Sequence, residues 1–97
     1  MKLPFNENLL ESNGISLSLP KMELLEWLDR HTDIDRVTVT VTYQLWTLKN
    51  QPDWTFDSGT QTKTFPITEL DVTLMTLLEM TIDLPDDTTA LLFRLTW

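Results

Sequence analysis

The side chains that enzymes most often use for catalysis are scarce in this 97-residue chain, which has one histidine, His31, and no cysteine. A nucleophilic triad needs a base beside its serine or cysteine. His31 falls at the predicted end of a helix, where a lone histidine more often compensates the helix dipole. Gly14 and Gly59 are the only glycines, so no glycine-rich loop can hold a phosphate. We therefore expect neither triad hydrolysis nor nucleotide chemistry, and zinc and iron sites are disfavoured too.

Three aspartates around Pro85 form the best candidate site for a hard cation. Asp83, Asp86 and Asp87 lie within five residues and offer the oxygen ligands that Ca²⁺ prefers. Their spacing does not match the twelve-residue Ca²⁺ loop, which also needs a central glycine. We interpret the segment as a solvated turn and expect no metal and no cofactor. A minimal metal-dependent hydrolase stays open as a third hypothesis for function, on this cluster alone.

The four tryptophans are the next candidates, because exposed tryptophan often anchors a protein interface. Trp27 lies on the apolar stripe of a predicted helix and should be in the core. Trp46, Trp54 and Trp97 each lie near the end of a predicted strand or beside a turn, where full burial is harder. We take these three as candidate partner-binding residues, with a place in the core as the alternative for each.

Threonine is unusually frequent, with sixteen residues, and two segments carry it at every second position. Thr38, Thr40 and Thr42 form one set, and residues 60–64 contain the other. If the two segments pair as strands, their threonines form a flat ladder of hydroxyl and methyl groups. The simplest interpretation is a solvated sheet face, since threonine is a good strand former. The functional interpretation is a docking surface for another subunit, or else for ice or a carbohydrate, and an exposed sheet edge could bind a partner strand.

The first third of the chain predicts a hairpin followed by a helix. Asn13-Gly14 suits a type I′ turn between two strands over residues 9–19, and the second strand should present Ile15, Leu17 and Leu19 to the core. Pro20 suits the first turn of a helix over residues 20–31. Its apolar stripe follows a spacing of three and four and comprises Met22, Leu24, Leu25, Trp27 and Leu28.

Residues 36–49 are the clearest strand, because β-branched residues alternate there. Val37, Val39, Val41 and Tyr43 share one face. Past Tyr43 large apolar residues fall on both faces, so either a bulge shifts the register or this end is covered on both sides. A turn at 50–53, a short strand at 54–56, a second turn at 57–59 and a strand at 60–65 ended by Pro66 would give three consecutive antiparallel strands.

The last third predicts a second helix and a final strand. Thr68 can cap a helix over residues 69–80 with a stripe of leucines, although residues 70–74 also alternate as a strand would. Residues 89–97 alternate and read as a central strand. The expected fold is α+β, in the order ββαβββαβ, with an antiparallel or mixed sheet of about five to six strands and two helices packed on one face. Residues 1–97 should form a single compact domain.

The composition limits the partners. Fifteen acidic residues against seven basic ones give a formal charge of −8, which opposes binding to phosphate backbones and anionic lipid. We therefore expect no nucleic-acid and no membrane partner. Glu7 and Glu11 interrupt the apolar residues near the N-terminus, which therefore lacks the core of a secretion signal, and no stretch has the length of a membrane span. The expected localisation is cytoplasmic.

Three hypotheses for function follow. The leading one is a non-enzymatic protein-binding module, in one version a homo-oligomeric structural or assembly component of a phage or bacterium. The alternative is a small acidic inhibitor that blocks a basic nucleic-acid-binding groove on a target protein, as a phage-encoded antagonist of host defence would do. The metal-dependent hydrolase comes third.

Overall fold

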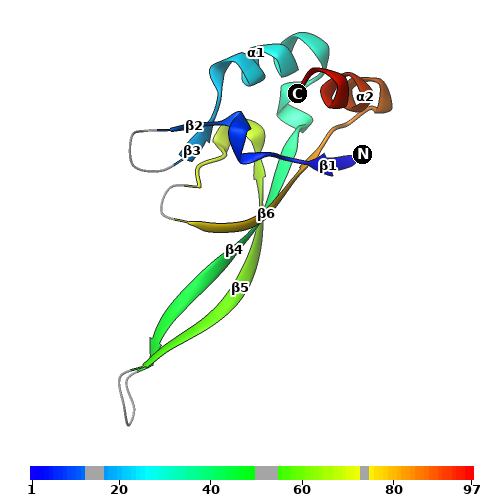
Figure 1. Cartoon of the computed structure of the whole chain (residues 1–97). Helices are drawn as coiled ribbons and strands as arrows, with labels where there is room; N and C mark the ends of the chain where they lie inside the picture. The colour runs from blue at the N-terminus through cyan, green and yellow to red at the C-terminus, as the bar shows by residue number, and fades with distance from the viewer. Residues whose placement is uncertain (13–16, 50–54, 73–74) are drawn as a thin grey trace.

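The structure is a computed structural model that describes residues 1–12, 17–49, 55–72 and 75–97. Those residues form a four-stranded antiparallel sheet, a separate two-stranded hairpin and two α-helices (Figure 1). The predicted α+β class is therefore confirmed, and the order of elements roughly follows the predicted one. The strands are β1 (Lys2–Pro4), β2 (Leu10–Ser12), β3 (Leu17–Pro20), β4 (Thr38–Lys49), β5 (Thr55–Pro66) and β6 (Thr76–Asp83). The helices are α1 (Met22–His31), α2 (Asp87–Thr96) and the short 3-10 helices η1 (Glu7–Leu9), η2 (Ile34–Arg36) and η3 (Ile67–Glu69).

The N-terminal hairpin consists of β2 and β3, which pair antiparallel as predicted. Its turn, including Asn13-Gly14 and Ile15, lies outside the described residues. The predicted core face is wrong at Leu19, whose side chain is 47% exposed. Leu19 lies opposite the exposed Glu11, whereas Leu10 and Pro20 lie opposite each other and are buried. Because strand residues alternate between faces, the burial of Leu10 and Pro20 turns Leu19 toward solvent.

Helix α1 confirms the predicted first helix, with a start two residues later. Leu24 and Leu28 are fully buried, and Leu25 and Trp27 pack partly buried against the core. Met22, predicted on the same stripe, is 62% exposed because it lies in the first turn, at the edge of the buried face.

Strand β4 is central in the sheet, whose order is β1-β6-β4-β5. Val39, Val41 and Tyr43 are buried on the face that meets the helices, as predicted. The register with β6 shifts between Thr42 and Tyr43, where Leu78 of β6 is the extra residue. The bulge predicted past Tyr43 is wrong, because β4 pairs with β5 without a shift as far as Lys49. Leu45, two residues past Tyr43, is 45% exposed, so at that residue the strand is not covered on both faces.

Strand β5 is a single strand, and the predicted turn at 57–59 is wrong. Its pairing with β4 is continuous from Pro66 opposite Thr38 to Thr55 opposite Lys49, and includes Gly59 opposite Leu45. The long partner supplies backbone hydrogen bonds along the whole segment, which overrides the turn preference of Asp-Ser-Gly. Pro66 ends the strand as predicted, and the predicted turn at 50–53 lies outside the described residues.

The types predicted for the last two elements are wrong: the predicted helix contains a strand, and the predicted strand is a helix. In place of a helix over 69–80 the chain forms strand β6, which pairs with β4 on the side opposite β5. In place of a strand over 89–97 it forms α2, whose N-cap Asp86 accepts the Thr89 N–H at 2.7 Å. Ala90 and Phe93 of α2 are buried at helical spacing. Neither α-helix among the described residues has the length and apolar character that a membrane crossing requires.

The core lies between the two helices and the inner face of the sheet, and β4 and β5 extend beyond it (Figure 1). The last residue of β4 that pairs with β6 is Gln44, opposite Thr76. Beyond it, residues 45–49 and 55–59 form a two-stranded arm. The arm gives the molecule extents of 55 × 28 × 21 Å and a radius of gyration of 15.9 Å, against about 12.5 Å for a compact chain of this length.

Candidate functional site

The predicted threonine ladder is present on the outer face of the sheet. Thr40 lies opposite Thr64 and Thr42 opposite Thr62, with hydroxyl oxygens 3.0 and 3.1 Å apart. Thr38 extends the row, but its neighbour on β5 is Pro66. The geometry of the ladder is therefore confirmed, whereas its role in partner binding stays a prediction.

A third strand widens this surface. On β6, Thr81 lies beside Thr40, and Glu79 lies beside Thr42. We call the surface the threonine face; its members are Thr38, Thr40 and Thr42 of β4, Thr60, Thr62 and Thr64 of β5, and Thr81 of β6. The helices cover the opposite face of the sheet, where the valines of β4 are buried. The threonine face is thus polar, nearly uncharged and uncovered by any described element.

Strand β5 forms one edge of the sheet along its full length of 12 residues. Every second residue of an antiparallel strand directs its N–H and C=O groups away from a given neighbour. Within the described residues no strand lies on that side of β5. Residues 59–64 are all exposed, and a Cβ atom added at Gly59 would meet nothing within 4 Å. A long edge of this kind is a template for strand addition.

The net negative charge of the molecule lies outside strands β4 and β5. Strands β4 and β5 carry Lys49, Lys63 and Asp57, a formal charge of +1. Since the whole chain carries −8, the other residues carry −9. The β5 edge is consequently the part of the surface where a second acidic molecule meets the least repulsion.

The three candidate tryptophans are not brought together at one site. Trp97 follows α2, is 38% exposed and makes an edge-to-face contact with Trp27 of α1, with ring centroids 6.5 Å apart. It therefore lies on the helical side of the sheet, away from the threonine face. Trp46 lies opposite Ser58 in the arm, but its side chain is outside the described part of the structure. Trp54 lies outside the described residues.

The outer side of α2 carries three exposed leucines that sequence reasoning missed. Leu91, Leu92 and Leu95 are 57, 40 and 77% exposed, and we call them the leucine face. The alternation over residues 89–97 predicted a central strand, in which the outward direction of these side chains is not visible. The signal that could have shown it is the cap residue Asp86 before a run of good helix formers.

The polar groups singled out for chemistry make structural contacts. Asp86 caps α2: its carboxylate accepts the Thr89 N–H at 2.7 Å and the hydroxyls of Thr89 and Thr32 at 2.9 and 3.2 Å. The Thr89 N–H holds the pKa of the Asp86 carboxyl below its usual value, and the Thr89 hydroxyl lowers this pKa further. Asp83 accepts a hydrogen bond from the amino nitrogen of Met1 at 3.2 Å.

His31 is the last residue of α1, as predicted. Its Nδ1 donates to the Trp27 carbonyl oxygen at 2.7 Å, and its ring stacks on the Trp27 indole at a centroid distance of 4.2 Å. Within the described ranges no three histidine, aspartate or glutamate side chains lie together in a group that could hold a metal ion.

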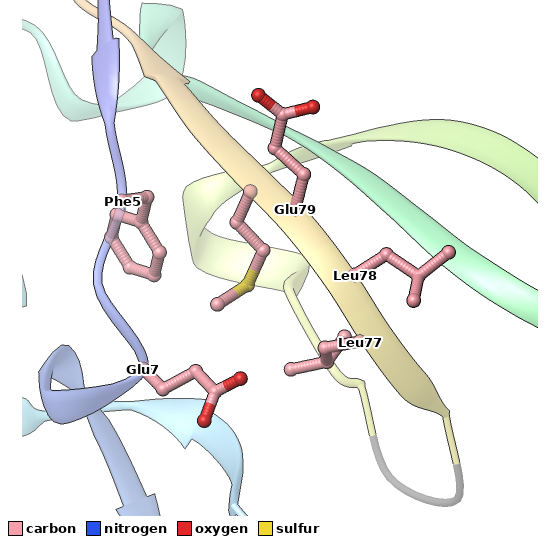
Figure 2. Close-up of a pocket in the computed structure, with 6 residues that line it drawn as sticks. Phe5, Glu7, Leu77, Leu78 and Glu79 are labelled. Atoms are coloured by element: carbon pink, nitrogen blue, oxygen red, sulfur yellow. The ribbon is translucent and has the colours of Figure 1, made fainter.

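A pocket of about 100 Å³ lies between β6 and the segment after β1 (Figure 2). Phe5, Leu77 and Met80 supply apolar walls, and Glu7 and Glu79 supply its carboxylates. Figure 2 shows these two carboxylates pointing apart, on different sides of β6. They do not form the facing pair that acid–base catalysis on a bound substrate requires. A second pocket of about 240 Å³ is lined by Leu3, Pro4, Asn6, Leu9, Phe93, Arg94 and Trp97.

No family model, curated protein or solved structure matches this chain.

Proposed function

We propose that this chain is a non-enzymatic protein-binding module that associates with itself by strand addition. The observation that carries the proposal is the free edge of β5, 12 residues long and bordered by the threonine face. Strand addition recruits backbone groups that are already ordered, so little conformational entropy is lost on binding. The low acidity of β4 and β5 favours this surface over the rest of a chain whose formal charge is −8.

The contacts of the polar side chains support a role in binding over one in catalysis. The Asp86 carboxylate is occupied as a helix cap, and the His31 ring is stacked and hydrogen-bonded within its own helix. His31, the candidate base, and Asp86, a candidate cation ligand, thus both make contacts that stabilise the ends of helices.

Size-exclusion chromatography with light scattering over a range of concentrations tests the proposal. The monomer has a mass of 11.3 kDa, and we expect the measured mass to rise toward twice this value. A strict monomer at high concentration would remove self-association.

Two double variants with the same type of change identify the surface. Thr60→Lys/Thr62→Lys adds charge to the exposed β5 edge and should keep the chain monomeric. Leu91→Lys/Leu95→Lys adds the same charge to exposed positions of α2 and should leave the association intact. The opposite pattern would assign the association to the leucine face.

The second candidate function is an acidic inhibitor of a basic groove. It is favoured by the charge of −9 outside β4 and β5, part of which lies on α1 as the exposed residues Glu23, Glu26 and Asp29. Binding to a basic target protein that weakens steeply with salt would support it. In that case Thr60→Lys/Thr62→Lys should leave binding unchanged, whereas replacing the three carboxylates of α1 with amides should weaken it.

A further inference from the structure

We propose that the partner on the β5 edge is the β5 strand of a second copy, paired antiparallel about a two-fold axis through Thr60. This inference rests on the proposed function and specifies its geometry. The two four-stranded sheets would join into one eight-stranded sheet, with the two β5 strands at its centre. A two-fold interface uses the same patch on both copies, so β5 has to be complementary to itself.

The charges of β5 supply this complementarity. Asp57 and Lys63 are its only charged residues, and they lie three residues on either side of Thr60. Antiparallel pairing centred on Thr60 sets the position of each Asp57 opposite the partner's Lys63, so this pairing of opposite formal charges occurs twice. Opposite charges that face each other across two strands are attractive, and like charges are repulsive.

Other registers lose this match. Directly opposite residues share a face of the sheet, so the two-fold axis has to pass through a residue position and not between two. A centre at Lys63 or at Asp57 would bring like charges together, and every other centre leaves both charges without a charged partner within β5. Thr60 is thus the one centre in β5 that pairs the charges favourably.

The same register continues the polar surface across the interface. Thr60 would lie opposite the partner's Thr60, and Thr62 would lie opposite the partner's Ser58. Because a two-fold axis perpendicular to the sheet preserves its faces, the threonine faces of both copies become one surface. Cross-strand pairs of hydroxyl residues are favourable in sheets.

The arrangement also keeps the acidic parts of the two copies apart. The helices lie toward the Pro66 end of β5 (Figure 1). Pro66 is six residues from Thr60, so the two Pro66 residues would be about 40 Å apart at ~3.4 Å per residue. This separation is several times the Debye length of about 8 Å at physiological salt. Residues 38–66 sum to zero formal charge, so the rest of each copy carries −8, and at this separation that charge opposes the pairing little.

Cross-linking with single cysteines tests the register directly, because the native chain has no cysteine. Thr60→Cys places two thiols opposite each other, at a Cα separation of about 5 Å. Thr62→Cys is the matched control: the two thiols would be offset by four residues, about 14 Å along the strands. Both positions are exposed in one copy, so both variants should fold. With a short bismaleimide, we expect covalent dimer from Thr60→Cys at least ten times faster than from Thr62→Cys.

Charge exchange gives a second, independent readout. Lys63→Asp should raise the dimer Kd by roughly ten- to hundred-fold, since two attractive pairs become two repulsive ones. Asp57→Lys should do the same, and the double exchange Asp57→Lys/Lys63→Asp should restore most of the affinity. Equal cross-linking of the two cysteine variants in a chain that light scattering shows to be dimeric would overturn the register while leaving self-association intact. A chain that stays at 11.3 kDa would remove both proposals.

Discussion

Replacing Gly59 with alanine should stabilise the protein. Gly59 lies inside β5 opposite Leu45, its φ is outside the left-handed range, and an added Cβ would meet nothing within 4 Å. Glycine in the interior of a strand costs about 0.5–1 kcal/mol relative to alanine, because it loses more backbone freedom on folding. We therefore expect Gly59→Ala to raise the free energy of unfolding by that amount. Gly59→Thr should raise it further, since threonine favours strands.

Urea unfolding followed by tryptophan fluorescence measures this change, and thermal unfolding should show a midpoint raised by about 2–8 °C. Both should be run at two protein concentrations, because association of the native state adds to the apparent stability. Thr60→Ala is the control at the neighbouring exposed position, where loss of a strand former should slightly lower stability.

The opposite sign would refute the reasoning. If residues 57–59 formed the turn that their types predict, Gly59 would adopt a positive φ. Any other residue there costs about 1–2 kcal/mol. A Gly59→Ala variant destabilised by such an amount would show that β5 is interrupted, and the continuous edge on which both proposals depend would not exist.

Three further outcomes follow from the packing, the cap and the ladder. Leu28→Ala should destabilise the fold by about 2–5 kcal/mol, because it opens a cavity at a fully buried position, whereas Leu95→Ala on the exposed side of α2 should change stability by less than about 0.5 kcal/mol. Since the folded pKa of Asp86 lies below its usual value of 3.8, its stabilising contribution is complete above that value and is lost as the pH falls through the folded pKa. The difference in unfolding free energy between the native chain and Asp86→Asn, which can still cap but does not titrate, should therefore shrink on acidification. A double-mutant cycle of Thr40→Val and Thr64→Val should give a coupling energy of about 0.2–1 kcal/mol.

Each of these has a contradicting result. Equal losses from the two leucine variants would mean that α2 is packed differently. A difference between native and Asp86→Asn that does not change with pH would remove the charge-dependent cap. Strictly additive effects at Thr40 and Thr64 would show that the two hydroxyls do not interact.

The parts of the fold that the sequence predicts correctly are those in which local preference and tertiary packing agree. In α1, apolar residues at helical spacing meet the core, and in β4 the alternating valines do so. The threonine ladder followed from the same reasoning, because Thr40 and Thr42 needed only a paired strand with the same alternation.

The errors arise where two periodicities compete. In residues 69–80 the leucines fit both a helix and a strand. Pairing with the side of β4 that β5 leaves open stabilises the strand. In residues 89–97 the alternation of Leu91, Phe93 and Leu95 suggested a strand, but the Asp86 cap and the burial of Ala90 with Phe93 decide for a helix. The pairing of β6 with β4 is a long-range contact that a local sequence pattern does not show. For α2, the one residue that indicates a helix start, Asp86, was outweighed by the alternation over residues 89–97.

The same limit applies to the candidate site. The threonines of β4 were identified from their spacing, but the free edge beside them depends on the strand order, which no local pattern reveals. The leucine face was missed because α2 was assigned to the wrong type of element. Asp57 and Lys63 drew no attention because their equal distances from Thr60 matter only in a strand that is continuous and lies at an edge.

Amide hydrogen exchange as a function of protein concentration tests the central claim most directly. If β5 is the binding edge, the peptide covering residues 55–66 should exchange more slowly as the concentration and the measured mass rise together. The peptide covering α2, with Leu91 and Leu95, should exchange at the same rate throughout. A rising mass with unchanged exchange in β5 would contradict the account, and protection appearing in α2 instead would place the interface on the leucine face.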